Sequence, residues 1–234
     1  KSMTYMKSDF QPGQGVALHG ERICLYDASA QTNHFCHHPH ICAHEGRLYA
    51  MWSNGRKGEG EIGQRVLYST SEDGLHWSDP ATLLADVLEA RTPLTLVPAG
   101  WLSNGKQLVA YVGAFHYHNP QRKQMDACGE FRYGVKCIGT RLLALTSTDG
   151  VQWSQPIDLN VPLCPNMGPQ RLQSGRLLIT GNWAHAYSDD PTGLSGWKLT
   201  SFCTDPFSQP NPLRDDPFAF WEVSRNMGYP VGLC

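Results

Sequence analysis

The chain has 234 residues, of which 41% are hydrophobic and 17% are charged, so it is long enough to bury the core of a globular domain. Lysine and arginine number 19 against 21 acidic residues, and the formal charge of -2 excludes a general electrostatic attraction to nucleic acid or anionic membranes. The longest apolar stretches fall far short of the roughly 20 residues that a membrane-spanning helix needs. The chain begins Lys1-Ser2-Met3 without an apolar signal segment, so we expect a soluble protein whose secretory leader was removed or never present.

Glycine and proline indicate a β protein. They occupy 23 and 16 positions and leave little room for long amphipathic helices. The 8 cysteines are spaced too irregularly to form a compact disulfide framework, and they leave the redox compartment open.

A repeated pattern, S-x-D-G-x-x-W-S-x-P, occurs at 71–80 and 147–156, and a degenerate copy occurs at 188–197. The Asp side chain accepts backbone N–H groups inside a tight turn, the Gly takes a positive φ, and the Trp packs the turn against a sheet. An apolar strand precedes each copy, and another hairpin precedes each of those strands, as at 40–52 in the first repeat. Four antiparallel strands with this box between the third and the fourth predict the blade of a propeller.

The spacing of the boxes predicts one all-β domain over 1–234, with blades at about 34–85, 86–160 and 161–204. A polar insertion at 116–138 lengthens the second blade. Because a propeller needs at least four blades to close, we expect this chain to be the N-terminal part of a six- or seven-bladed propeller. The remaining blades would come from a C-terminal continuation or from a partner chain. The alternative is a twisted open sheet that a partner chain completes.

The boxes resemble the Asp boxes of the sialidase superfamily across all three blades, and this resemblance implies the fold rather than the reaction. The stretches 32–40, 51–55 with 63–66, and 166–171 resemble the propeller polysaccharide lyases, among them the ulvan lyases and related enzymes that act on rhamnosyl-glucuronate linkages. Exo-sialidases usually carry Arg-Ile-Pro near the first blade, whereas Arg22-Ile23 is followed here by Cys24. We therefore expect a secreted or periplasmic carbohydrate-active protein whose partner is an acidic oligo- or polysaccharide.

The site is expected where the first strand of each blade begins, because the loops at that end of a propeller meet at the mouth of the central channel. A histidine can remove a proton near neutral pH, and a planar guanidinium grips a carboxylate with two parallel hydrogen bonds. In the β-elimination of a uronate, a base, a cation and an acid take part, and histidine, arginine and tyrosine suit these roles. The candidate catalytic residues are His37, His38, His40 and Tyr133, and the candidate substrate-binding residues are Asn54, Arg65, Arg91, Asn166, Arg171 and His185.

Each of these candidates also has a structural interpretation. The histidines can satisfy backbone groups at the entry to a strand. The arginines can tie strands together or cover a tryptophan, and the tyrosine in the long loop can serve packing or stacking.

The insertion offers His116, His118, Cys128 and Cys137 as ligands of a structural zinc ion, which would order a polar loop. The spacing fits no standard zinc finger. A disulfide between Cys128 and Cys137 explains the same cysteines. The third possibility is that these cysteines form neither a zinc site nor a disulfide. Cys36 beside His37 and His38 allows a second metal interpretation.

Three functions remain in competition. The first is a lyase that cleaves a uronic-acid-containing polysaccharide. The second is a glycoside hydrolase of the sialidase kind, either an exo-sialidase or an enzyme like an α-L-rhamnosidase, in which a tyrosine nucleophile acts with a carboxylate and an arginine cluster. The third is a noncatalytic carbohydrate-binding propeller. The lyase is favoured because the stretches named above resemble the propeller polysaccharide lyases. We expect no organic cofactor.

Overall fold

A computed structural model describes residues 20, 22–29, 31, 33–58, 63–86, 94–117, 137–180 and 185–200, and its strands form three four-stranded antiparallel sheets. The first sheet has the order β1 (Phe35–His44), β2 (Arg47–Gly55), β3 (Arg65–Ser71) and β4 (Ala81–Leu84). The second has β5 (Leu94–Ser103), β6 (Leu108–Tyr117), β7 (Cys137–Ser147) and β8 (Ile157–Asp158). The third has β9 (Gln170–Arg171), β10 (Leu177–Thr180), β11 (His185–Ser188) and β12 (Lys198–Thr200).

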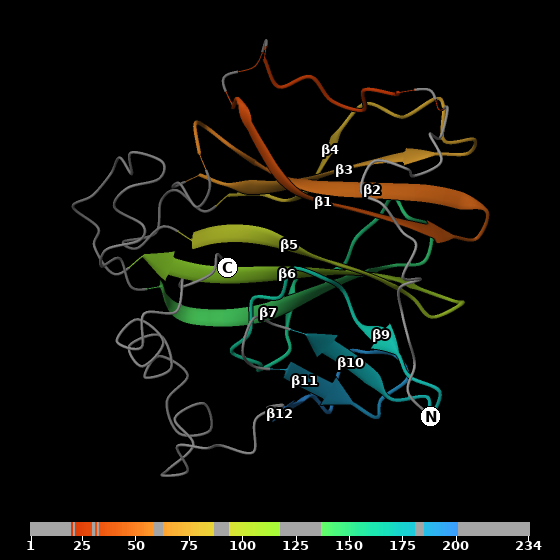
Figure 1. The fold of residues 1–234 in the computed structure, drawn as a ribbon, viewed down its shortest axis with the longest axis vertical. Helices are drawn as coiled ribbons and strands as arrows, with labels where there is room; N and C mark the ends of the chain where they lie inside the picture. Colours follow the sequence, from red (N-terminus) through yellow and green to blue (C-terminus); the bar gives the residue numbers. More distant parts are fainter. Residues whose placement is uncertain are drawn as a thin grey trace, which may run out of the picture.

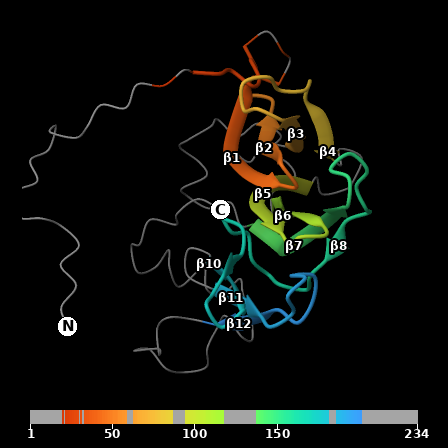
Figure 2. The same ribbon diagram turned by 90° about the vertical axis from the view of Figure 1, so that its right-hand side faces the viewer.

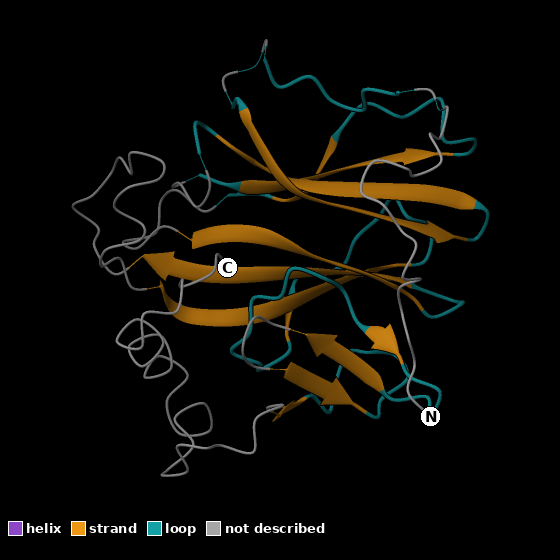
Figure 3. Cartoon of the chain, in the orientation of Figure 1, coloured by secondary structure: helices purple, strands orange, loops and turns teal. Residues whose placement is uncertain are grey.

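The three sheets are stacked in chain order (Figure 1). When the molecule is turned by 90°, β1 and β5 lie on one side of the stack, and β4 and β8 lie on the other (Figure 2). The described residues contain strands and loops and no helix, so no helix among them could span a membrane (Figure 3). This is the blade order that the sequence predicts, and the all-β propeller-blade fold is confirmed.

Successive side chains of a strand point to opposite faces of its sheet, so every blade has two faces. The apolar faces pack against the neighbouring blades. Between the first two sheets the core includes Met51, Val66 and Leu96, each at most 1% exposed. Between the second and third sheets it includes Leu142 and Ile179, both fully buried. The core therefore lies between blades and holds them face to face.

The first two boxes form the same hydrogen-bonded turn. In the first, Asp73 Oδ1 accepts the backbone N–H groups of Leu75 and His76, both at 2.8 Å. In the second, Asp149 Oδ1 accepts those of Val151 and Gln152, again at 2.8 Å. The glycine after each Asp has a φ of 79° or 71°, which an L side chain rarely adopts.

The tryptophan of each later box packs against the blade that precedes it in the chain. The ring of Trp153 in the second box lies 5.6 Å from that of Tyr68, in the first blade. The Trp197 ring in the third box lies 6.4 Å from that of Tyr111 in the second blade, and Tyr111 donates to the Gly193 carbonyl at 2.9 Å. The first box has no described blade before it, and Trp77 packs on its own sheet, against the cluster of Ala50, Trp52 and Leu67.

Two details differ from the sequence prediction. The first strand begins at Phe35 rather than near His40, so the histidine stretch belongs to the strand and not to the loop entering it. The backbone of β6 and β7 extends to Tyr117 and Cys137, which leaves a shorter connection, at 118–136, outside the described residues.

Candidate functional site

The two ends of each blade differ in the residues they carry. We call the end at which β1, β5 and β9 begin the strand-entry end, and the end with the three boxes the box end. The strand-entry end of the first blade holds His37 and His38 on β1 and Arg65 on β3. Asn54 on β2, which pairs with Arg65, lies at the same end of this sheet.

A β-bulge shapes the histidine stretch. The pairing of β1 with β2 shifts between His37, opposite Ser53, and His40, opposite Met51. Pro39 in between has no N–H to donate to a partner strand, and His38 takes a φ of 50°. Because this φ is uncommon outside glycine, a histidine held there is a feature typical of functional sites. The His37 and His38 rings stand 3.9 Å apart between centroids.

His40 lies apart from this pair, in the contact between the first two blades. The Trp101 indole donates to the His40 carbonyl at 3.3 Å. Burial lowers the pKa of the His40 imidazole, and a hydrogen bond with the backbone of Pro98 acts in the opposite direction. A half-buried imidazole between blades suits packing, so the catalytic assignment of His40 loses its support.

Asn54 is fully buried, which rules out the direct substrate contact expected of it. Its Nδ2 donates to the carbonyls of Asn33 at 3.1 Å and Phe35 at 3.2 Å, and its Oδ1 accepts from Arg65 Nε at 3.1 Å. The carboxamide joins the entry to β1 with the start of β3.

His37 and Arg65 project from opposite faces of the sheet. Cys36, Asn54 and Arg65 are successive cross-strand partners and share one face. His37 is next to Cys36 and pairs with Ser53, so it belongs to the other face. Two strand spacings separate their backbones by about 10 Å.

Arg171 lies at the box end, so the prediction that it faces the same channel mouth as Arg65 is wrong. Its guanidinium donates to the Gly175 carbonyl at 3.1 Å and to the Pro191 carbonyl at 2.9 Å. The reason is the brevity of β9, which ends at Arg171 just before the turn into β10. The residue ties that turn to the third box.

The other candidates are dispersed or lie outside the described residues. His185 is 6% exposed at the start of β11, and burial lowers its pKa. Asn166 is exposed in the loop before β9. Arg91 and Tyr133 lie outside the described residues, so their roles stay predictions.

The zinc and disulfide predictions also concern residues that are largely beyond the described part of the chain. His118 and Cys128 lie outside it, and for His116 and Cys137 the strand backbone alone is described. Among the described residues, no group of three or more His, Cys, Asp or Glu side chains is placed to hold a metal ion. Cys24, Cys36 and Cys42 are free thiols, and burial raises the pKa of Cys42 to about 12.

Two buried polar residues at the strand-entry end are not among the sequence-predicted site residues. Ser53 Oγ donates to the His37 carbonyl at 2.9 Å, and Gln64 Nε2 donates to the Leu96 carbonyl at 2.8 Å. Both side chains are fully buried. Their positions next to Asn54 and Arg65 in the sequence are the available signal, since a polar residue facing a neighbouring blade needs a specific partner.

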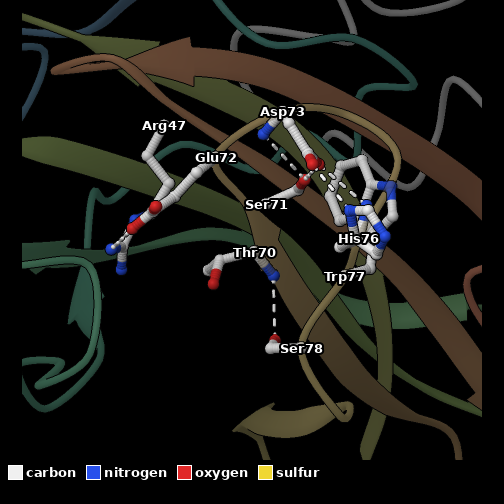
Figure 4. Close-up of a pocket in the computed structure, with 8 residues that line it drawn as sticks. All are labelled: Arg47, Thr70, Ser71, Glu72, Asp73, His76, Trp77 and Ser78. Carbon is white, nitrogen blue, oxygen red and sulfur yellow. Dashed lines mark hydrogen bonds and ion pairs between the residues drawn. The ribbon is translucent and has the colours of Figure 1, made fainter.

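The box end of the first blade contains an open polar cleft of about 390 Å³ (Figure 4). Arg47 and Glu72 form an ion pair at 2.7 Å on one side of it. On the other, His76 Nδ1 and Asp73 Oδ2 are 2.6 Å apart. This contact, with the backbone N–H bonds, lowers the pKa of Asp73, while the Asp73 hydrogen bond and charge raise the pKa of His76.

We expect His76→Gln, which copies Gln152 of the second box, to remove a pH-dependent part of the stability. The raised pKa of His76 means that its contribution is complete below the unfolded value of about 6.5 and disappears as the pH rises through the folded value. The depressed pKa of Asp73 removes the contribution again only in strong acid. The difference in melting temperature between the two proteins should therefore be larger near about pH 5 than near about pH 9. An equal difference at both pH values would contradict the ion pair.

Comparisons with known proteins identify the fold. No protein-family model matches the chain, and no curated protein matches it significantly. Among solved structures, the chain is similar to Zg3597, a family 117 glycoside hydrolase from Zobellia galactanivorans, with a TM-score of 0.52 and 14% identity over 77% of this chain and 59% of that one.

Two further solved structures are also among those to which the chain is similar. A Trypanosoma rangeli sialidase in complex with sialic acid gives a TM-score of 0.49 and 14% identity, over 72% of this chain and 30% of the sialidase. The α-L-arabinofuranosidase Arb93A from Fusarium graminearum gives a TM-score of 0.40 and 12% identity, over 69% of this chain and 44% of that one. The chain thus spans less than two thirds of each of these proteins, and at such identities the similarity concerns the fold alone.

Proposed function

We propose that this chain belongs to a carbohydrate-active enzyme that hydrolyses glycosidic bonds of an acidic oligo- or polysaccharide at the strand-entry end. The observation that carries the proposal is the gathering of His37, His38 and Arg65 at that end of the first blade. The two rings stand together on a bulge, and Asn54 holds the guanidinium. The similarity of the fold to a family 117 glycoside hydrolase supports hydrolysis over other carbohydrate chemistry.

The residues at this end suit two tasks. Arg65 can bind a carboxylate of the substrate through its terminal nitrogens, because its Nε is already bonded to Asn54. His37 or His38 can transfer a proton to or from the sugar. Hydrolysis also needs a carboxylate or a tyrosine as its second group. Glu59 and Glu61, in the connection from β2 to β3, are candidates that lie outside the described residues.

Elimination is the second candidate, and the same histidine pair favours it. A histidine base would take the proton beside the uronate carboxylate while an arginine neutralises that carboxylate. The electron pair would form the carbon–carbon double bond as the bond to the leaving oxygen breaks, and an acid, for which Tyr133 is the sequence-based candidate, would protonate that oxygen. This chemistry requires no second carboxylate. It rests on the sequence stretches and on this pair of side chains.

A product analysis separates the two candidates. The chain is incubated with uronate-containing and sialylated oligosaccharides and with neutral analogues, and the products are followed by reducing-end assay and by ultraviolet absorbance. Hydrolysis should release reducing ends from the acidic substrates without absorbance, whereas elimination adds the absorbance of the conjugated unsaturated uronate. Binding of these sugars without cleavage would contradict both and indicate a noncatalytic carbohydrate-binding propeller.

A further inference from the structure

A row of three side chains crosses the first blade at the strand-entry end. Cys36 on β1 pairs with Asn54 on β2, and Asn54 pairs with Arg65 on β3, so all three lie on one face. Cys36 is exposed, Arg65 is half-buried, and Asn54 between them is fully buried. The order across the sheet is thus an exposed thiol, a buried amide and a cation.

Asn54 uses its hydrogen-bonding capacity on this row and on the chain entering it. Nδ2 donates to two backbone carbonyls and stands 3.7 Å from Cys36 Sγ, and Oδ1 accepts from Arg65 Nε. Within the described residues, the two Nη groups of Arg65 have no hydrogen-bond partner. Because the Nε–H bond fixes one edge of the planar guanidinium, the other donors are presented in a defined direction.

We propose that Asn54 is a positioning residue that aims Arg65 at a carboxylate of the bound sugar, forming an anion subsite on the face of the blade that also carries Cys36. This rests on the proposed function, since it names the group by which an acidic substrate would be held. A buried amide is suited to the task because burial leaves it one arrangement in which all of its polar atoms are paired.

Cys36 provides a reporter for this subsite that needs no catalytic turnover. Partial burial raises the pKa of its thiol, and the hydrogen bond from Asn54 and the charge of Arg65 act in the opposite direction. Iodoacetate and iodoacetamide alkylate a thiolate by the same displacement of iodide, and they differ in that iodoacetate carries a carboxylate. An anion subsite beside the thiol should favour iodoacetate.

The experiment measures, by mass spectrometry of the peptides, the ratio of the two alkylation rates at Cys36 in low salt. We expect Arg65→Gln to lower this ratio by about threefold or more, and added salt to lower it in the parent chain, since a nearby unit charge acts through a screened Coulomb interaction. Asn54→Ala keeps the Arg65 cation but removes the hydrogen bond that orients it. The ratio in this variant should therefore fall between those of the parent chain and of Arg65→Gln. The ratio at exposed Cys24 serves as the reference and should not change.

Arg65→Lys is the matched variant, because it keeps the charge and lacks the Nε–H that Asn54 accepts. Its ratio should resemble that of Asn54→Ala. An unchanged ratio in Arg65→Gln would overturn the anion subsite, and an unchanged ratio in a folded Asn54→Ala would overturn the positioning role. If Asn54→Ala does not fold, a Lys variant that matches the parent chain overturns it instead. A preference for iodoacetate in a chain that cleaves no sugar would retain the subsite and reject the enzyme.

Discussion

Replacing His37 and His38 together by alanine is expected to slow cleavage of an acidic oligosaccharide by about 100-fold or more, the lower range for losing a general acid or base. The two rings are 3.9 Å apart on the bulge of β1, so one histidine could partly substitute for the other in a single variant. The double change removes both. Initial rates at saturating substrate, measured through the product assay, report the effect on kcat.

The matched control is His76→Ala, which removes a histidine that is exposed at the box end of the same blade. Its cleavage rate should stay within about twofold of the parent rate, because a surface substitution remote from the reacting groups changes little. A double variant that folds and retains the parent rate would remove both histidines from the mechanism. Circular dichroism establishes whether the variants fold.

Gly100→Ala is expected to destabilise the protein by at least about 3 kcal/mol, or roughly 6–12 °C in melting temperature for a chain of this size. Gly100 has a φ of 99° at the bulge of β5, and a Cβ built on it would meet the backbone N of Gly168 and stand 2.5 Å from its Cα. A backbone cannot move aside as a flexible side chain can. The strain of the left-handed conformation and the overlap therefore add.

Gly105→Ala separates these two contributions. Gly105 has a φ of 87° in the turn between β5 and β6, and a Cβ there would meet nothing within 4 Å. We expect this variant to lose only about 1 kcal/mol, the cost of the left-handed conformation. Equal losses in urea unfolding of the two variants would show that the approach of Gly168 contributes nothing.

The boxes allowed the fold to be predicted because their chemistry is local. Ser, Asp, Gly and Trp form a turn through contacts within about six residues, as Ser71 and Asp73 do, so the pattern carries its structure wherever it occurs. The spacing between copies then fixes the number of sheets. Nothing in this inference needs knowledge of the packing between blades.

The site was predicted less well because its residues depend on register. The bulge at His38 and Pro39 draws the histidines into the strand, and the short β9 carries Arg171 to the box end. A shift of one residue exchanges the two faces of a sheet, and polarity alone does not reveal it. For the same reason Asn54, a polar residue expected to bind the substrate, is buried between Cys36 and Arg65.

The contact of each later box with the blade before it gives the structure a direction. Trp153 contacts Tyr68 and Trp197 contacts Tyr111, so the tryptophan of each of these boxes needs the preceding blade to be already folded. The ribosome synthesises the blades in that same order. In the emerging chain, each tryptophan can therefore pack against a blade that has already folded. Unfolding would then spread toward the C-terminus. Unfolding of the first blade removes the contact that Trp153 of the second blade makes, whereas unfolding of the third blade leaves the contact between Trp153 and Tyr68 intact.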